Sequence, residues 1–166
     1  MLSVGDGTCH ILRAGDEALV WDCAPSPPGG VLPPIVQNAR ALGVWRTPTV
    51  VITHPDFDHF GGLPEVLEPL GVRRVIVPQR FIDQARDEPR QAAAWLLGFL
   101  ESRGVEVRAI ARGETIPLGR ATLEILSPPD EAAWPLDNDH SIMARLATPA
   151  GGLLLTGDAQ EHAIDE

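Results

Sequence analysis

The sequence predicts a mixed α/β (α+β) domain in which two layers of sheet are flanked by helices. Three observations support this prediction. A β-hairpin stands early in the chain, strands and helices then alternate, and a run of strands with no helix between them starts at residue 105. Alternation is typical of parallel strands joined by helices, and an uninterrupted run of strands is typical of an antiparallel sheet. The length of 166 residues fits a single domain over 1–166.

Turn residues and apolar spacing locate the elements of the first half. Helices are predicted where apolar residues recur every three or four positions and a glycine follows the last turn. The longest helix has Trp95 in its apolar stripe and ends before Gly104. The predicted strands are 1–4, 10–13, 19–22, 49–53 and 73–77, and the predicted helices are 33–42, 63–70 and 89–103.

The second half is predicted to be mostly strand. Short apolar runs bounded by turn residues, such as Pro149-Ala150-Gly151, are typical of consecutive antiparallel strands. Residues 128–137 are predicted to form a loop, and a final helix is expected to begin at residue 159. The predicted strands are 105–110, 115–118, 121–126, 142–147 and 152–156.

The composition narrows the classes of function. The chain carries 13 basic and 23 acidic residues, a formal net charge of −10. This charge argues against broad electrostatic capture of nucleic acid, although bound divalent ions reverse the field locally, so a nuclease remains compatible with it. No apolar run reaches the ~18 residues of a membrane span, and no signal peptide is visible. The tryptophans are interpreted as packing residues because they are not interleaved with arginine: Trp21, Trp45, Trp95 and Trp134.

The two cysteines flank the predicted hairpin. If the register pairs Leu12 with Val20, Cys9 lies opposite Cys23, and a cross-strand disulfide is geometrically conceivable. The alternative is a pair of buried free thiols, which the absence of a secretion signal favours.

The most informative segment is residues 53–62, Thr-His-Pro-Asp-Phe-Asp-His-Phe-Gly-Gly. It follows a buried strand, and loops at strand ends are where sheets of this kind place ligands. Four side chains able to bind metal fall within six positions, and imidazole with carboxylate suits a divalent ion. These side chains are His54, Asp56, Asp58 and His59.

A second strand end offers another carboxylate. Asp158 follows strand 152–156 and is a natural bridge between two ions about 3.5–4 Å apart. Structural readings compete with these assignments. Residues 54–59 can form a polar surface turn, and Asp158 can cap the final helix. Asp22 is interpreted as ordering a nearby turn through its own backbone hydrogen bonds.

The pattern His-x-Asp-x-Asp-His followed by Gly-Gly resembles the metal motif of the metallo-β-lactamase superfamily. Asp56 stands where the superfamily usually has a second histidine, and in this the chain resembles the nuclease-like domain of the ComEC family of DNA-uptake proteins. Three further segments are similar to that family, in the same order along the chain: 2–7, 138–142 and 153–158.

The resemblance implies an αββα sandwich with two divalent ions, manganese or zinc, with magnesium as a further option. His54 and Asp56 would hold the first ion, Asp58 and His59 the second, and Asp158 would bridge them. The third ligand of the first ion would be Asn138, Asp139 or His140. Asp58 would also orient the attacking water, which makes it the expected catalytic residue.

The implied activity is hydrolysis by metal-activated water, with single-stranded DNA as the expected substrate. The family is attached to membranes, which implies the outer face of a membrane. The superfamily supplies a further histidine after the Gly-Asp strand, so the sandwich is expected to be incomplete and the chain truncated. Two alternatives stay open: hydrolysis of small esters, thioesters or lactams, and an inactive fragment or binding domain.

Overall fold

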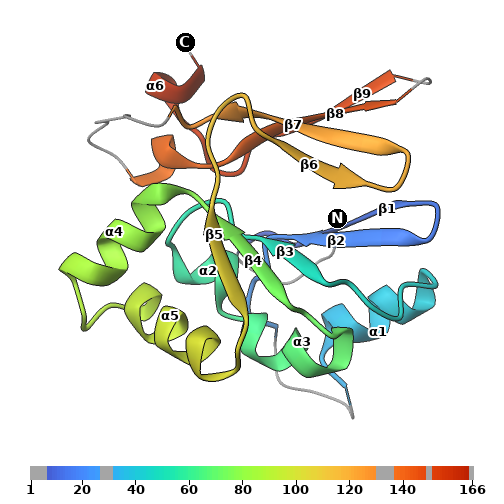
Figure 1. Ribbon diagram of the computed structural model, residues 1–166, viewed down its shortest axis with the longest axis horizontal. Helices are drawn as coiled ribbons and strands as arrows, with labels where there is room; N and C mark the ends of the chain where they lie inside the picture. The colour runs from blue at the N-terminus through green and yellow to red at the C-terminus, as the bar shows by residue number, and fades with distance from the viewer. Residues whose placement is uncertain (1–6, 27–31, 130–136, 149–150, 165–166) are drawn as a thin grey trace.

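The computed structural model describes residues 7–26, 32–129, 137–148 and 151–164. These residues form two sheets that face each other, with helices on the outer side of the first sheet (Figure 1). The mixed α/β prediction with two sheet layers is therefore confirmed. In the described part of the chain, every helix falls short of the length and apolar character that a membrane span requires.

The first sheet has the order β1-β2-β3-β4-β5. β1 pairs with β2 as an antiparallel hairpin, and β2 to β5 run parallel to one another. The carboxyl ends of the parallel strands therefore meet at one edge, where a ligand site is expected. The strands are β1 His10–Ala14, β2 Glu17–Trp21, β3 Thr49–Val51, β4 Arg74–Val77 and β5 Glu106–Ala109.

The second sheet is antiparallel throughout, with the order β6-β7-β8-β9. Its apolar side chains, among them Leu123 and Ile125, pack against Trp21 and Val51 of the first sheet in one buried cluster. This contact fixes how the two sheets lie relative to each other. The strands are β6 Thr115–Leu118, β7 Ala121–Ser127, β8 Met143–Thr148 and β9 Gly151–Leu155.

A second apolar cluster fills the space between the first sheet and its helices. Val50 and Val75 of the sheet meet Val36 of α1 and Leu96 of α5 there, all of them buried. The helices are α1 Pro34–Ala41, α2 Phe57–Phe60, α3 Leu63–Leu70, α4 Gln79–Asp87, α5 Ala92–Ser102 and α6 Glu161–Ile164, with a 3₁₀ turn, η1, over Asp137–His140.

The structure departs from the prediction around α4 and α5. The sequence analysis missed α4, because only Phe81 and Ala85 of its nine residues are buried and the rest of the helix is polar apart from Ile82. The predicted helix 89–103 starts later, at Ala92. Its apolar stripe also differs, since Trp95 is 58% exposed. Strand 1–4 and most of the predicted loop 128–137 fall outside the described residues.

The hairpin register differs by one residue from the register that would align the two cysteines. Leu12 pairs with Leu19, because the turn contains only Gly15 and Asp16. Cys9 and Cys23 are both buried free thiols. Burial and the nearby charge of Asp22 raise the pKa of Cys9 to about 12, so this thiol stays protonated at neutral pH.

Candidate metal centre

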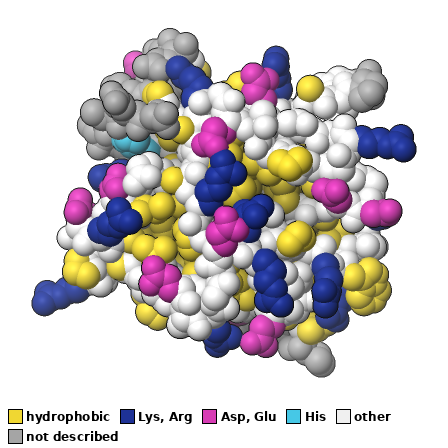
Figure 2. Space-filling model, viewed as in Figure 1, with side chains coloured by type: hydrophobic (Ala, Val, Ile, Leu, Met, Phe, Trp, Pro, Cys, Tyr) yellow, Lys and Arg dark blue, Asp and Glu magenta, His cyan; other side chains and the backbone are white. Residues whose placement is uncertain are grey.

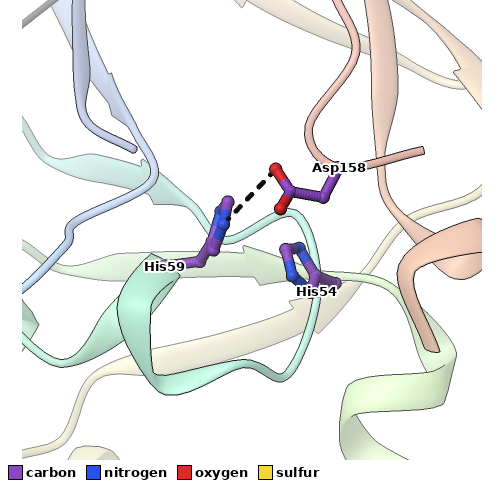
Figure 3. Close-up of side chains that lie close together, drawn as sticks. All are labelled: His54, His59 and Asp158. Carbon is purple, nitrogen blue, oxygen red and sulfur yellow. Dashed lines mark ion pairs between the residues drawn. The ribbon is translucent and has the colours of Figure 1, made fainter. Parts of the chain in front are cut away.

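The loop after β3 carries two buried imidazoles to the carboxyl edge of the first sheet. β3 ends at Val51, and the short helix α2 turns the chain back so that His59 faces His54 (Figure 3). The two ring centroids are 4.0 Å apart, and neither side chain is more than 1% exposed. Two imidazoles this close provide nitrogen donors for a shared metal region.

Asp158 reaches the same point from the second sheet. It follows Gly157, whose φ is 54° and whose Cβ position would be 3.0 Å from Cβ of Thr53. Only a glycine allows the end of β9 to approach the loop so closely. As a result, Oδ1 of Asp158 lies 3.5 Å from Nε2 of His59. His54, His59 and Asp158 each offer one donor atom, and these three atoms lie within 4.8 Å of one another.

The remaining two carboxylates of the motif lie at the rim of this cluster. Oδ2 of Asp56 is 3.4 Å from Nε2 of His54, and Oδ2 of Asp58 is 3.7 Å from Nε2 of His59. Their side chains are 49% and 47% exposed. Each carboxylate is therefore next to one imidazole and open to solvent, although neither belongs to the tight group of three.

The structure places the candidates for a third ligand in η1. Asp139 is buried, and its Oδ1 accepts a hydrogen bond from the backbone N–H of Gln160 at 3.0 Å. His140 is also buried. Among the described residues, neither of the two joins the group of three donors. A third ligand from Asn138, Asp139 or His140 is therefore a prediction of the sequence alone.

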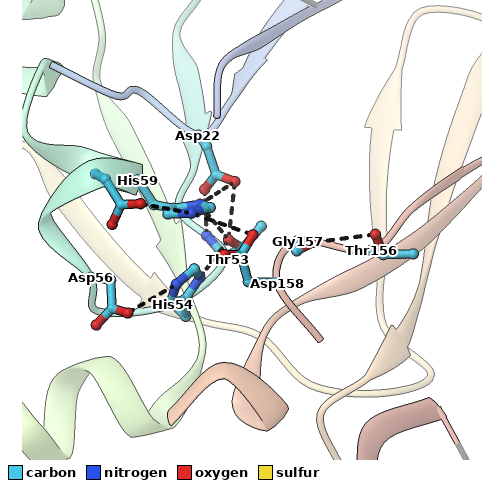
Figure 4. Close-up of polar contacts among 9 residues, drawn as sticks. Asp22, Thr53, His54, Asp56, His59, Thr156, Gly157 and Asp158 are labelled. Carbon is cyan, nitrogen blue, oxygen red and sulfur yellow. Dashed lines mark hydrogen bonds and ion pairs between the residues drawn. The ribbon is translucent and has the colours of Figure 1, made fainter. Parts of the chain in front are cut away.

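A buried aspartate supports both imidazoles from behind (Figure 4). Oδ2 of Asp22 is 3.0 Å from Nδ1 of His59, and the carboxylate also accepts hydrogen bonds from the backbone N–H and the hydroxyl of Thr53 at 2.8 and 3.0 Å. The Thr53 hydroxyl lies 3.0 Å from Nδ1 of His54. The interpretation of Asp22 as a turn residue bonded to its own backbone is wrong, because its carboxylate binds these side chains instead.

The sequence analysis missed this role of Asp22 because it depends on strand pairing. The parallel pairing of Trp21 with Val51 brings residues 22 and 53 together across 31 positions of sequence. The available signal was an aspartate directly after the apolar strand Ala18-Leu19-Val20-Trp21. Asp158 likewise lies shortly after a strand, β9, and reaches the same cluster.

Burial and neighbouring charges shift the pKa values of the two histidines in opposite directions. Burial, followed by the proximity of His59, lowers the pKa of His54, so this imidazole is neutral at neutral pH. Burial also works to lower the pKa of His59, but the hydrogen bond that its ring donates to Asp22 and the charges of Asp22, Asp158 and Asp58 outweigh it, and the pKa is raised. A hydrogen bond at Nδ1 leaves Nε2 of a histidine as the metal-binding atom.

The donor set fits a divalent cation. Nε2 of His54 is buried and has no hydrogen-bond partner among the described residues. A buried polar atom without a partner is costly, and a metal ion at that position would satisfy it. Imidazole nitrogen together with carboxylate oxygen is a combination that zinc and manganese accept.

Comparison with known proteins identifies the fold family. The model of the metallo-beta-lactamase superfamily matches residues 2–165. The chain belongs to the metallo-beta-lactamase superfamily. The resemblance found in the motif is thereby confirmed, and with it a hydrolase fold whose members typically hold divalent metals.

A bacterial relative agrees with this assignment. ComE operon protein 3 of Bacillus subtilis (strain 168) is 27% identical over 134 residues, which are 80% of this chain and 16% of that protein. The chain therefore spans a small part of this relative. The identity to ComE operon protein 3 confirms the resemblance to the ComEC family.

Solved structures share the superfamily fold at low identity. Zinc-bound PqqB from Methylobacterium extorquens has a TM-score of 0.55 at 15% identity, over 87% of this chain and 46% of that structure. The subclass B3 metallo-beta-lactamase BJP-1 of Bradyrhizobium japonicum has a TM-score of 0.57 at 17% identity, over 89% and 55%. The chain spans about half the length of both structures.

The contact between Asp22 and His59 predicts that Asp22 contributes measurably to metal affinity. Asp22→Asn removes the carboxylate that orients His59, and loss of such outer partners typically costs about 10- to 100-fold in metal affinity. Calorimetric titration with manganese or zinc measures the change. Asp16→Asn, in the turn at the far end of the same hairpin, is the control and should bind as the wild type does. Equal affinity in both variants would contradict the support role.

Proposed function

We propose that this chain is a metal-dependent phosphodiesterase that hydrolyses single-stranded DNA. The observation that carries the proposal is the convergence of His54 and His59 with Asp158, which brings donors from both sheets to one point around a buried imidazole nitrogen that forms no hydrogen bond with the described residues. The likeness to ComE operon protein 3 supports nucleic acid as the substrate class.

The residues present would hold two divalent ions. His54 and Asp56 would hold one, Asp58 and His59 the other, and Asp158 would be shared between them. When bound, such ions activate water as a nucleophile and offset the negative charge of a phosphodiester. Asp56 replaces an imidazole with a harder oxygen donor, which favours manganese or magnesium, while zinc remains compatible with the set.

The chain's own side chains supply orientation and proton handling. Asp58 is half exposed beside His59, so its carboxylate can accept a hydrogen bond from the attacking water and hold it in line with the substrate. Asp22 and Thr53 fix the two imidazoles from the buried side. Water is the nucleophile in this scheme, so no serine or cysteine is required.

A second candidate is a hydrolase of small esters, thioesters or lactams. The acidic surroundings favour it, since the cluster gathers the carboxylates of Asp22, Asp56, Asp58 and Asp158 in a chain of net charge −10. A neutral small substrate approaches such a site without the repulsion that a polyanion meets. A panel containing a lactam, a thioester and an aryl phosphodiester separates the two activities.

The resemblance to the ComEC family also supports a location at the outer face of a membrane, as part of a membrane-attached protein. Protease accessibility of the natural protein in intact cells tests it, because only an outer domain is cleaved by added protease.

Manganese-dependent cleavage of an end-labelled single-stranded oligonucleotide tests the activity. We expect fragments with manganese, none with a chelator, and roughly a 100-fold lower rate for Asp58→Asn, in the range that a positioned acid or base contributes. Asp87→Asn, an exposed aspartate at the end of α4, is the matched control and should keep the full rate.

Two outcomes would overturn the proposal in different ways. Metal bound by calorimetry without cleavage of any oligonucleotide would exclude the nuclease and leave the small-molecule hydrolase to the substrate panel. No measurable binding of manganese or zinc would indicate instead an inactive domain that does not hold the metal.

A further inference from the structure

An exposed tryptophan stands at the opposite end of β3 from the metal centre. Trp45 lies in the segment between α1 and β3 and is 66% exposed. Its interpretation as a packing residue is therefore wrong. The backbone around it is nevertheless fixed, because Val44 and Thr47 are buried and the hydroxyl of Thr47 lies 3.0 Å from the carbonyl oxygens of both Ala18 and Thr49. The indole is held out into solvent by an anchored loop.

Three arginines surround this indole. The guanidinium carbon of Arg40 lies 5.6 Å from the ring centroid of Trp45, and Nε of Arg40 is buried without a hydrogen-bond partner among the described residues. Arg13 is fixed in place by hydrogen bonds to the carbonyl oxygens of Leu42 and Gly15, at 2.7 and 2.9 Å. Arg13, Trp45 and Arg46 line a hollow of about 280 Å³.

The three arginines near Trp45 differ in their contacts from four arginines elsewhere on the described surface. Those four form ion pairs with glutamates: Arg74 with Glu106, Arg103 with Glu68, Arg108 with Glu114 and Arg145 with Glu124. Arg13, Arg40 and Arg46 form no ion pair with the described residues. In a chain of net charge −10, three cations beside one aromatic ring are a local reversal of the charge. Figure 2 shows basic side chains beside exposed hydrophobic ones at the lower right, where α1 lies in Figure 1.

The hollow also contains one carboxylate, that of Asp16. Glu17 is next to it in sequence, but its carboxylate accepts a hydrogen bond from the backbone N–H of Gly119 at 3.0 Å. Arg13 and Arg46 against Asp16 leave the hollow net positive, and Arg40 adds a further cation beside the indole. The side chains therefore suit an anion that also has a flat ring for the indole.

We propose that Trp45 with Arg13, Arg40 and Arg46 is a binding site for single-stranded DNA, separate from the metal centre. This inference rests on the proposed function for the choice of DNA. One base stacks on the indole, and the adjacent phosphates pair with the guanidinium groups. An unpaired base is required, because a base within a duplex has both faces covered by its neighbours. The site holds the strand at one end of β3 while the metal centre lies at the other end.

Fluorescence anisotropy of an end-labelled oligothymidylate tests the site, with the full chain, a chelator and low salt. The chelator removes metal-dependent binding and cleavage from the measurement. Trp45→Ala is expected to weaken binding roughly tenfold, as the loss of one stacked base does. Arg46→Gln is expected to reduce the slope of log affinity against log salt by about 0.7, the value for one phosphate contact with a single strand.

The matched control is Trp95→Ala. Trp95 is another exposed tryptophan, stacked on Phe99 of α5, and its loss should leave affinity unchanged. Equal effects of Trp45→Ala and Trp95→Ala, or binding by neither the wild type nor the variants, would overturn the inference. Displacement of the oligonucleotide by polyglutamate of equal charge would also overturn it, since a general anion surface needs no base.

The outcomes separate this inference from the proposed function. Binding that depends on Trp45 in chelator, without manganese-dependent cleavage, leaves the site standing and removes the nuclease. Cleavage that persists while Trp45→Ala binds like the wild type leaves the nuclease standing and removes the site. Circular dichroism of each variant checks that the fold is unchanged.

Discussion

His59→Ala is expected to lower the affinity for manganese or zinc by about 100-fold or more. His59 is the centre of the cluster: its Nε2 lies 3.5 Å from Asp158 and 3.7 Å from Asp58, and its Nδ1 lies 3.0 Å from Asp22. The variant removes a donor and also releases the carboxylate that supports it. Loss of an outer partner alone costs about 10- to 100-fold, so loss of the donor should cost at least the upper value. Calorimetric titration gives the affinity directly.

His10→Ala is the control for this measurement. His10 lies on β1 and is not among the three clustered donors, so its loss should leave metal affinity unchanged. A matching loss in both variants would mean that the metal is bound elsewhere on the chain. A urea titration of each variant without metal identifies any loss that comes from unfolding, because Asp22 is left buried and without its imidazole in His59→Ala.

The sequence predicted the convergence of metal-capable side chains that are close along the chain. His54 and His59 follow an apolar strand, and strand ends at one edge of a parallel sheet place such side chains together. Asp158 was predicted by the same reasoning, at the end of the second sheet. The helix over residues 63–70 and the strand over 115–118 also have the predicted bounds, because a proline or glycine marks their ends.

The parts that sequence could not predict depend on partners far along the chain. The contact of Asp22 with His59 requires the parallel pairing of β2 with β3, which no local pattern specifies. The exposure of Trp45 requires that Val44 and Thr47 on either side be anchored inward, although tryptophan is more often a packing residue. In both cases, tertiary contacts decide what the side chain does, and composition and periodicity do not report them.

Gly62→Ala is expected to destabilise the fold by about 1–3 kcal/mol or more and to weaken metal binding. The metal loop is bonded to the segment after β2: the N–H of Cys23 donates to His59 at 2.7 Å, and the N–H of Gly62 donates to Cys23 at 2.8 Å. A methyl group at position 62 would collide with the carbonyl oxygen of Ala24 and lie 3.0 Å from that of Cys23. Both obstacles are backbone atoms, so relief requires the loop to move away from β2 and to carry His59 away from Asp22.

Gly98→Ala provides a control with the opposite sign. Gly98 lies inside α5, is exposed, and has open space where a Cβ would be added. Alanine in an exposed helix interior is more stable than glycine by roughly 0.5–1 kcal/mol, so this variant should unfold at higher urea than the wild type. Urea midpoints of the two variants and manganese titration of each give both readouts. If Gly62→Ala kept the stability and the metal affinity of the wild type, the close approach of the loop to the segment after β2 would not be what positions His59.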